Sequence, residues 1–156
     1  MVLSSSAFQN SKSIPARYAH KGVTGGQNIS FPLVWRDIPP QIKSFSLSIV
    51  DQHPIARKWV HWHVINIPAN VFQLSEGASR KQMPQGAKEL YNSFGEIGYG
   101  GPQPPKGSGS HRYEVTLYAL SIDRLELSQN STLSAFERAI EGKILAYASL
   151  IGFYER

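Results

Sequence analysis

The chain contains no cysteine among its 156 residues, which excludes disulfides, thiolate zinc sites and cysteine nucleophiles. Charged residues make up only 17%, too few for a disordered tail, a coiled coil or a highly charged nucleic-acid-binding arm. No stretch approaches the roughly 18 consecutive apolar residues of a membrane span. Residues 1–15 also lack the charged and apolar regions of a secretory signal. We therefore expect a soluble, cytoplasmic protein without a membrane span.

What is present favours a compact all-β domain. Hydrophobic residues reach 41%, and a chain of this mass hides roughly 69% of its unfolded surface on folding, so we expect a single domain over residues 1–156. Thirteen glycines and ten prolines favour short strands and long loops over a helical bundle. The net charge is +5, and no acid precedes Asp37. A solvated surface with a modest basic bias explains this better than a lipid or nucleic-acid partner.

Period-two alternation of apolar residues predicts strands at 45–50 and 113–120, bracketing prolines mark a further one at 59–68, and three- to four-residue spacing predicts one late helix. The expected strands are 45–50, 59–68, 113–120 and 149–154, with an earlier one between Pro32 and Pro39. Leu133, Phe136, Ile140, Ile144 and Tyr147 share one face of the expected helix, which Ser131 or Thr132 can cap. Residues 76–110 show no sustained periodicity, and a loop of that length is usually functional.

Four of the five histidines fall beside two of these strands, at His53, His61, His63 and His111. Strand alternation places His61 and His63 on one face, with Trp62 on the other, and gives His111 and Tyr113 a common face. Imidazole and phenol groups that converge beside glycine- and proline-rich loops form a pocket of hydrogen-bond donors, which suits a phosphate or a carboxylate.

Asp51, at a strand end, can fix the tautomer of a histidine and leave the other ring nitrogen free for the ligand, or it can receive a ligand ammonium group. Two other interpretations compete. A lone strand histidine is more often a structural residue, and His63 fits that description best. The His-x-His pattern with a distant His and an Asp also matches zinc or iron sites. Residues 107–111 lack the strand-turn-helix context of a serine nucleophile and are expected to form a flexible loop.

Four segments resemble the phosphatidylethanolamine-binding protein family, in the bacterial and archaeal branch related to the Raf kinase inhibitor protein. They are SAFQNSKSIPARYAHKG with ISFPLVW, then VDQHPIARKWVHWHVINIPA, YGGPQPPKGSGSHRYEVTLYAL and AIEGKILAYASLIGFYER. The resemblance implies an antiparallel β-sandwich with Greek-key connections, a helix near the C-terminus and a small anion pocket for phosphate-like or phospholipid head groups. It also implies modulation of a kinase or protease and allows a homodimer.

Residue by residue, the resemblance assigns Asp51, His61, Gly101, Pro104, His111 and Tyr113 to ligand binding. Where the family usually has Asp-Pro-Asp-x-Pro, this chain has Asp51-Gln52-His53-Pro54. His53 thus replaces a carboxylate, which favours anions over an ethanolamine ammonium group, and we include it in the pocket.

The leading hypothesis is a binding protein without catalytic activity or cofactor, whose pocket holds a small phosphorylated or anionic ligand. The alternative is an enzyme that uses the same histidines, either metal-dependent or a phosphoester hydrolase with a His/Asp pair. Neither hypothesis includes nucleic acid as a partner.

Overall fold

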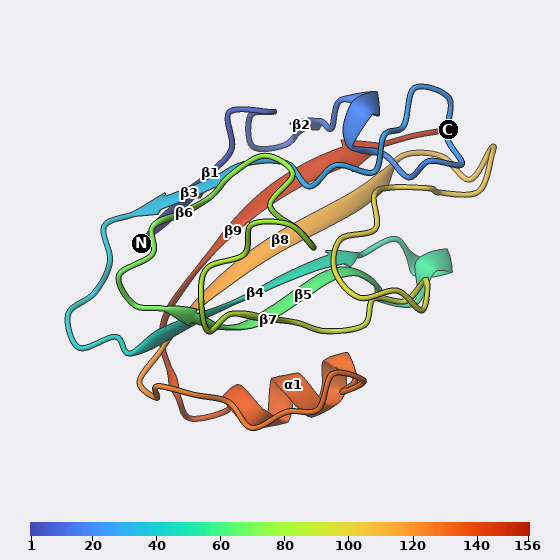
Figure 1. Cartoon of the computed structure of the whole chain (residues 1–156). Helices are drawn as coiled ribbons and strands as arrows, with labels where there is room; N and C mark the ends of the chain where they lie inside the picture. The colour runs from blue at the N-terminus through green and yellow to red at the C-terminus, as the bar shows by residue number, and fades with distance from the viewer.

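The computed structural model describes residues 1–156 and shows two stacked β-sheets with one α-helix outside them (Figure 1). The larger sheet has the order β2–β9–β8–β4–β5–β7, and the smaller has the order β1–β3–β6. The strands of the larger sheet are β2 (Lys12–Ser13), β9 (Ile144–Tyr154), β8 (His111–Leu120), β4 (Ser44–Asp51), β5 (Trp59–Pro68) and β7 (Lys88–Glu89). Those of the smaller sheet are β1 (Val2–Ser4), β3 (Leu33–Arg36) and β6 (Gln73–Leu74). The predicted all-β sandwich with one C-terminal helix is confirmed.

The larger sheet has a Greek-key connection. β4, β5 and β7 lie side by side, and β8 then returns to pair with β4 instead of β7, which gives the order β8–β4–β5–β7. All its pairs are antiparallel except that of β2 with β9. Every residue of β4 pairs with β8, from Ser44 opposite Leu120 to Asp51 opposite Tyr113. The end of β4 therefore lies beside the start of β8.

The main core fills the space between the sheets. Phe45, Leu47 and Ile49 of β4 face inward, where they join Leu33 and Trp35 of the smaller sheet. The opposite face of β4 carries serines that are also buried. Part of this outer face is covered by α1 (Leu133–Ile140), whose buried residues belong to a second apolar cluster. That double coverage explains why every residue of β4 is buried.

The predicted strands at 45–50 and 59–68 correspond to β4 and β5, and the predicted strand at 113–120 begins two residues earlier, at His111. The predicted helix was too long. It ends at Ile140, and Gly142 then takes a left-handed conformation with φ of 71° that turns the chain into β9. Ile144 and Tyr147 belong to that strand, where Tyr147 pairs with Tyr118. Their helical spacing was coincidental, because pairing with β8 fixes an extended backbone. The predicted cap Thr132 is confirmed.

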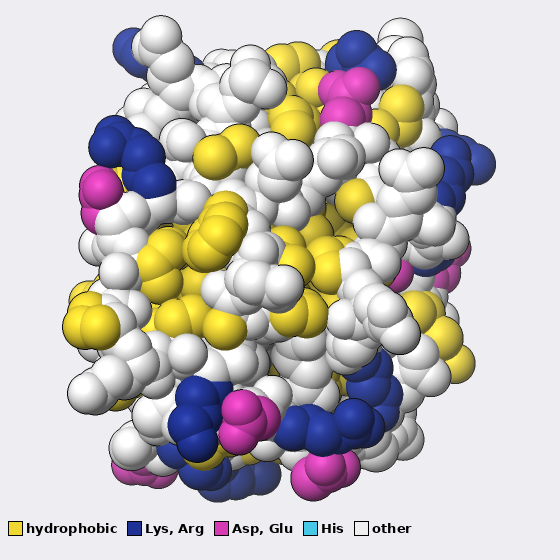
Figure 2. Space-filling model, turned by 60° about the vertical axis from the view of Figure 1, so that its left-hand side comes forward, with side chains coloured by type: hydrophobic (Ala, Val, Ile, Leu, Met, Phe, Trp, Pro, Cys, Tyr) yellow, Lys and Arg dark blue, Asp and Glu magenta, His cyan; other side chains and the backbone are white.

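The outer face of the smaller sheet exposes Val2 and Val34, and Phe72 is exposed just before β6. Figure 2 brings the left-hand side of Figure 1 forward and shows hydrophobic side chains gathered in the middle of this view, with charged side chains towards its edges. The end of β4 and the start of β8, beside which the histidines lie, are at the right of Figure 1. The helix α1 has eight residues, and no helix has the length and apolar character needed to traverse a bilayer.

Candidate functional site

A cavity of about 840 Å³ opens at the end of the sandwich where β4 ends and β5 and β8 begin. The register brings its residues together, because Asp51 lies opposite both Tyr113 of β8 and Trp59 of β5. The lining comprises Asp51, Ile55, Ala56, Arg57, Lys58, Trp59, His61, Ser93, Phe94, Gln103, Pro104, Pro105, His111 and Tyr113. Five of the seven residues expected to bind ligand thus line one cavity.

His61 reaches this cavity through a β-bulge. Ile49 pairs with Trp62 and Val50 pairs with Val60, which leaves His61 as an extra residue between them. Its ring packs edge-on against Tyr113, with the centroids 5.0 Å apart. His63 lies on the other side of the sheet, where it packs against Phe136 of α1. The prediction that His61 and His63 share a face was wrong, because the bulge interrupts the alternation on which it depended.

The hydrogen bond of His61 defines its protonation. Its Nδ1 lies 2.7 Å from the carbonyl oxygen of Gly100, which can only accept, so Nδ1 carries the proton. Burial lowers the pKa of His61 from 6.5 to about 4, because a buried ring loses the hydration of its charged form. At neutral pH the ring is therefore neutral, and Nε2 is a hydrogen-bond acceptor.

Asp51 and His111 form a buried pair inside a longer chain of hydrogen bonds. Nδ1 of His111 donates to Oδ2 of Asp51 at 2.6 Å, and the other carboxylate oxygen accepts the backbone N–H of His53. Nε2 of His111 lies 2.9 Å from the hydroxyl of Ser108, and that hydroxyl donates to the carbonyl of Pro105 at 2.6 Å. Both ring nitrogens of His111 and both carboxylate oxygens of Asp51 are therefore engaged within the protein.

These hydrogen bonds confirm that Asp51 orients a histidine. The expectation that the second ring nitrogen of that histidine is free for a ligand was wrong. The other ring nitrogen of His111 does not face a ligand, because Ser108 occupies it. Ser108 belongs to residues 107–111, which were expected to form a flexible loop. No signal in the sequence pointed to this contact, because it depends on how the loop folds back onto His111.

His53 supports the pair from outside the cavity lining. Its ring stacks on that of His111, with centroids 3.9 Å apart and planes 13° apart. Its Nδ1 accepts the N–H of Ile55 at 3.3 Å at the start of a short 3₁₀ turn (Pro54–Ala56), so the lone pair of Nδ1 is engaged. The ring therefore acts on the site through its contact with His111.

The hydroxyl of Tyr113 is buried near the carboxylate of Asp51 but makes no hydrogen bond of regular geometry. Burial, followed by the negative charge of Asp51 and the proximity of its carboxylate to the hydroxyl, raises the pKa of this phenol well above its usual value, so the hydroxyl keeps its proton. An unpaired buried polar group is costly. This hydroxyl is therefore a candidate contact for a ligand.

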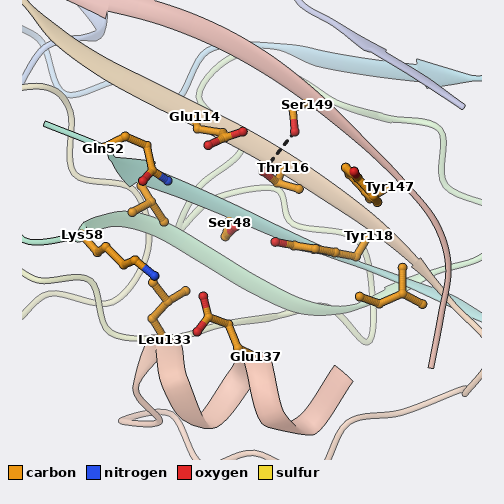
Figure 3. A pocket seen from close by; sticks show the side chains of 12 residues that line it. Ser48, Gln52, Lys58, Glu114, Thr116, Tyr118, Leu133, Glu137, Tyr147 and Ser149 are labelled. Atoms are coloured by element: carbon orange, nitrogen blue, oxygen red, sulfur yellow. Dashed lines mark hydrogen bonds between the residues drawn. The ribbon is translucent and has the colours of Figure 1, made fainter. Parts of the chain in front are cut away.

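Sequence reasoning missed the cation and the aromatic rings of the cavity. Arg57 lines it from a left-handed conformation with φ of 49°, and Trp59 and Phe94 form an aromatic wall, with centroids 5.3 Å apart. Lys58 also lines it, but its side chain points towards α1 (Figure 3). Arg57 makes no ion pair. Arg57 therefore brings a positive charge without an ion-pair partner to the wall of the cavity.

Pro104 lines the cavity, whereas Gly101 does not. The backbone N–H of Gly101 donates to the side chain of Asn28 at 2.7 Å. A Cβ at Gly101 would lie 2.2 Å from the carbonyl oxygen of Tyr18. This glycine permits close packing of the cavity loop against the N-terminal segment.

The side chains do not assemble a metal centre. No group of three His, Asp or Glu side chains is placed so that it could hold an ion together. The bulge separates His63 from His61, and the two nitrogens of His111 are already engaged. The expected His-x-His ligand pair is thus divided between two faces of the sheet.

The fold and the cavity define a β-sandwich protein with a histidine- and tyrosine-lined cavity at one end, and comparisons with known proteins place this chain in a family. Residues 4–155 match the model of the phosphatidylethanolamine-binding protein family, and the chain belongs to that family. A UPF0098 protein of Aquifex aeolicus is 37% identical, with 100% of this chain and 89% of the relative covered.

Two solved structures are also similar. Escherichia coli YbcL, described as a new member of the mammalian PEBP family, superposes with a TM-score of 0.92 at 30% identity, covering 99% of this chain and 97% of the other. A Chlamydia trachomatis protein, CT736, described as a phosphatidylethanolamine-binding protein homologue, gives a TM-score of 0.84 at 35% identity with the same coverage.

Proposed function

We propose that the cavity binds the phosphate-like, singly charged group of a small ligand and that the protein acts by binding, without catalysing a reaction. The observation that carries this proposal is the buried hydroxyl of Tyr113 on the wall of the cavity, which makes no hydrogen bond of regular geometry. An anionic oxygen is the natural acceptor for this proton donor. Modulation of a kinase or protease, which the family resemblance implies, would use the surface around this cavity.

The charges favour one negative charge on the ligand. Asp51 is engaged by His111 and by the backbone N–H of His53, His61 is neutral, and Arg57 contributes one positive charge without an ion-pair partner. A phosphate monoanion can accept from Tyr113 and Arg57 and donate its own O–H to Nε2 of His61. The dianion of a phosphate ester lacks that proton and would face the lone pair of His61.

A phosphoester hydrolase with a His/Asp pair is less consistent with the geometry. In such an enzyme the free nitrogen of the oriented histidine must reach the attacking group. Here Nε2 of His111 lies 2.9 Å from Ser108, and the Ser108 proton is directed to Pro105. The pair supports the wall of a binding cavity better than it supports proton transfer.

Two buried tyrosines offer a matched test by isothermal titration calorimetry with inorganic phosphate and phosphoethanolamine. The Tyr113 hydroxyl makes no hydrogen bond of regular geometry, whereas that of Tyr99 donates to the carbonyl of Tyr18 at 2.7 Å. Tyr113→Phe should weaken anion binding by about tenfold or more without loss of folding stability. Tyr99→Phe should lower the free energy of unfolding by about 1 kcal/mol and keep the affinity.

The two probes also separate ligand classes. Comparable affinity for both would place recognition in the phosphate group, which they share. Equal affinity of Tyr113→Phe and the unmodified protein, or no measurable binding of either anion, would contradict the proposed function.

A further inference from the structure

A second cavity, of about 440 Å³, lies on the outer side of the larger sheet at the beginning of α1. Its lining includes His63, Lys58, Asn130 and Ser134. It adjoins the cavity described above, with which it shares Arg57, Lys58 and Ser93. It extends to the face of the sheet that carries His63, opposite to the face of His61. Of the two cavities, only this one includes His63 and the start of α1.

The first turn of α1 presents free hydrogen-bond donors to this cavity. Thr132 caps the helix by accepting the N–H of Ala135 at 3.2 Å. The backbone N–H groups of Leu133 and Ser134 have no acceptor among the hydrogen bonds of the structure. Unpaired N–H groups at a helix N-terminus, together with the helix dipole, favour an anion.

His63 supplies an independent observation. Its side chain is 1% exposed and lines the cavity, and its Nε2 is buried without any hydrogen-bond partner. One side of the ring packs against Phe136, with centroids 4.2 Å apart. Burial lowers the pKa of His63 to about 4, so the ring is neutral and has one N–H to donate. A buried imidazole without partners beside unpaired backbone donors indicates a missing acceptor.

The charges around the helix start are also favourable. Lys58 makes no ion pair, and Figure 3 shows its side chain pointing towards Leu133. Glu137 lies one turn further along α1 and faces the groove beside the sheet in the same view. Arg57 lines the second cavity too, so two cations and one carboxylate surround it. The balance is one positive charge.

We propose that this second cavity binds a small oxoanion of the phosphate type, held by the N-terminus of α1, His63 and Lys58. The ligand is either inorganic phosphate or a small ester that carries a phosphate group. The inference does not depend on ligand binding at the first cavity.

The test uses two substitutions at Ser134, which is exposed in the first turn of α1. Ser134→Glu places a carboxylate where the helix dipole favours it, so the fold should be retained while the anion is repelled. Ser134→Gln has similar size and no charge, and is the matched control. Inorganic phosphate and glycerol 3-phosphate are titrated separately at constant ionic strength, with the ring signals of His63 and the amide signals of residues 133–135 followed by NMR.

Saturable shifts of these signals are expected, with affinity reduced at least tenfold in Ser134→Glu and within threefold in Ser134→Gln. Tighter binding of glycerol 3-phosphate would assign the site to an ester, and equal binding would assign it to free phosphate. Shifts that appear only at His61 and Tyr113 would overturn this second site and leave the first intact. Equal effects of the two substitutions would overturn it as well.

Discussion

The ring of His53 stacks on that of His111, with the ring centroids 3.9 Å apart. The backbone N–H of Ile55 donates to Nδ1 of His53 and fixes the orientation of this ring at the start of the 3₁₀ turn. His111 in turn donates from Nδ1 to Oδ2 of Asp51 at 2.6 Å. The position where the family pattern has a carboxylate therefore carries a ring that packs on the histidine partner of Asp51.

His53→Asp should reverse the preference of the first cavity. A carboxylate beside the Asp51–His111 pair adds a negative charge, so affinity for inorganic phosphate should fall by about tenfold. Affinity for ethanolamine should rise. Calorimetry with the two probes measures both, and His53→Asn serves as the uncharged control. If the aspartate and asparagine variants bind phosphate equally, charge at this position does not determine selectivity.

Anion affinity should depend on pH through the ligand. His61 offers a lone pair at neutral pH, so the bound phosphate ester must carry a proton. The second pKa of a phosphate ester is about 6, so the monoanion becomes about tenfold scarcer with each pH unit above it. The dissociation constant of methyl phosphate should therefore rise about tenfold per unit between pH 7 and 8.

Methyl sulfate is the control for this pH dependence, because it is a monoanion without an exchangeable proton. It should bind weakly and with little change over the same range. A methyl phosphate affinity that is constant from pH 6 to 8 would show that the dianion is accepted, contrary to the charge assignment.

Ser108→Ala tests the chain that ends at Pro105. Removal of the hydroxyl leaves Nε2 of His111 without its partner and frees the loop, so phosphate affinity should fall about three- to tenfold and stability by about 1 kcal/mol. Ser108→Thr keeps the hydroxyl, so its phosphate affinity and stability should stay close to those of the unmodified protein. Ser110 is exposed and makes no side-chain hydrogen bond, so Ser110→Ala is the matched control. Similar losses in the two alanine variants would argue against a positioning role for Ser108.

Acid should destabilise the fold, because two buried histidines take up protons more readily in the unfolded chain. The pKa values of His61 and His63 are lowered from 6.5 to about 4 by burial, so the unfolded chain binds protons at a pH where the folded chain does not. Stability is therefore complete above about pH 6.5 and decreases towards pH 4, by about 3 kcal/mol for each histidine.

Urea unfolding at pH 7, 6, 5 and 4 measures this decrease. His63→Leu should remove the contribution of one histidine and flatten the profile, since leucine suits the apolar contact with Phe136. A profile of unchanged slope in that variant would assign the acid sensitivity to other groups.

Local patterns in the sequence predicted the parts of the fold that local physics determines. Alternation located β4 and β8, because each has an apolar face that must be buried. The same rule misplaced His63, since nothing in the composition of β5 marks His61 as the extra residue of a bulge. Helical spacing likewise included Tyr147, although pairing with β8 decides its conformation.

For the candidate site, the sequence was enough to find most of the titratable residues but not the hydrogen bonds between them. Asp51, His111 and Tyr113 were predictable because strand ends collect them. The engagement of both nitrogens of His111 depends on how the loop of Ser108 folds back, which no spacing rule describes. Arg57 was missed because a left-handed arginine before a strand leaves no pattern in the sequence.

The pairing of β2 with β9 also limits how early the sheet can form during synthesis of the protein. Lys12 pairs with Gly152, and Ile14 covers that glycine so closely that a Cβ would lie 2.5 Å from it. In the sheet β9 lies between β2 and β8, although it is the last strand to leave the ribosome. The N-terminal segment must therefore wait unpaired until synthesis reaches β9, and contacts of such long sequence separation form slowly. Stalled or C-terminally shortened chains would expose the edge of β8 and be prone to aggregation.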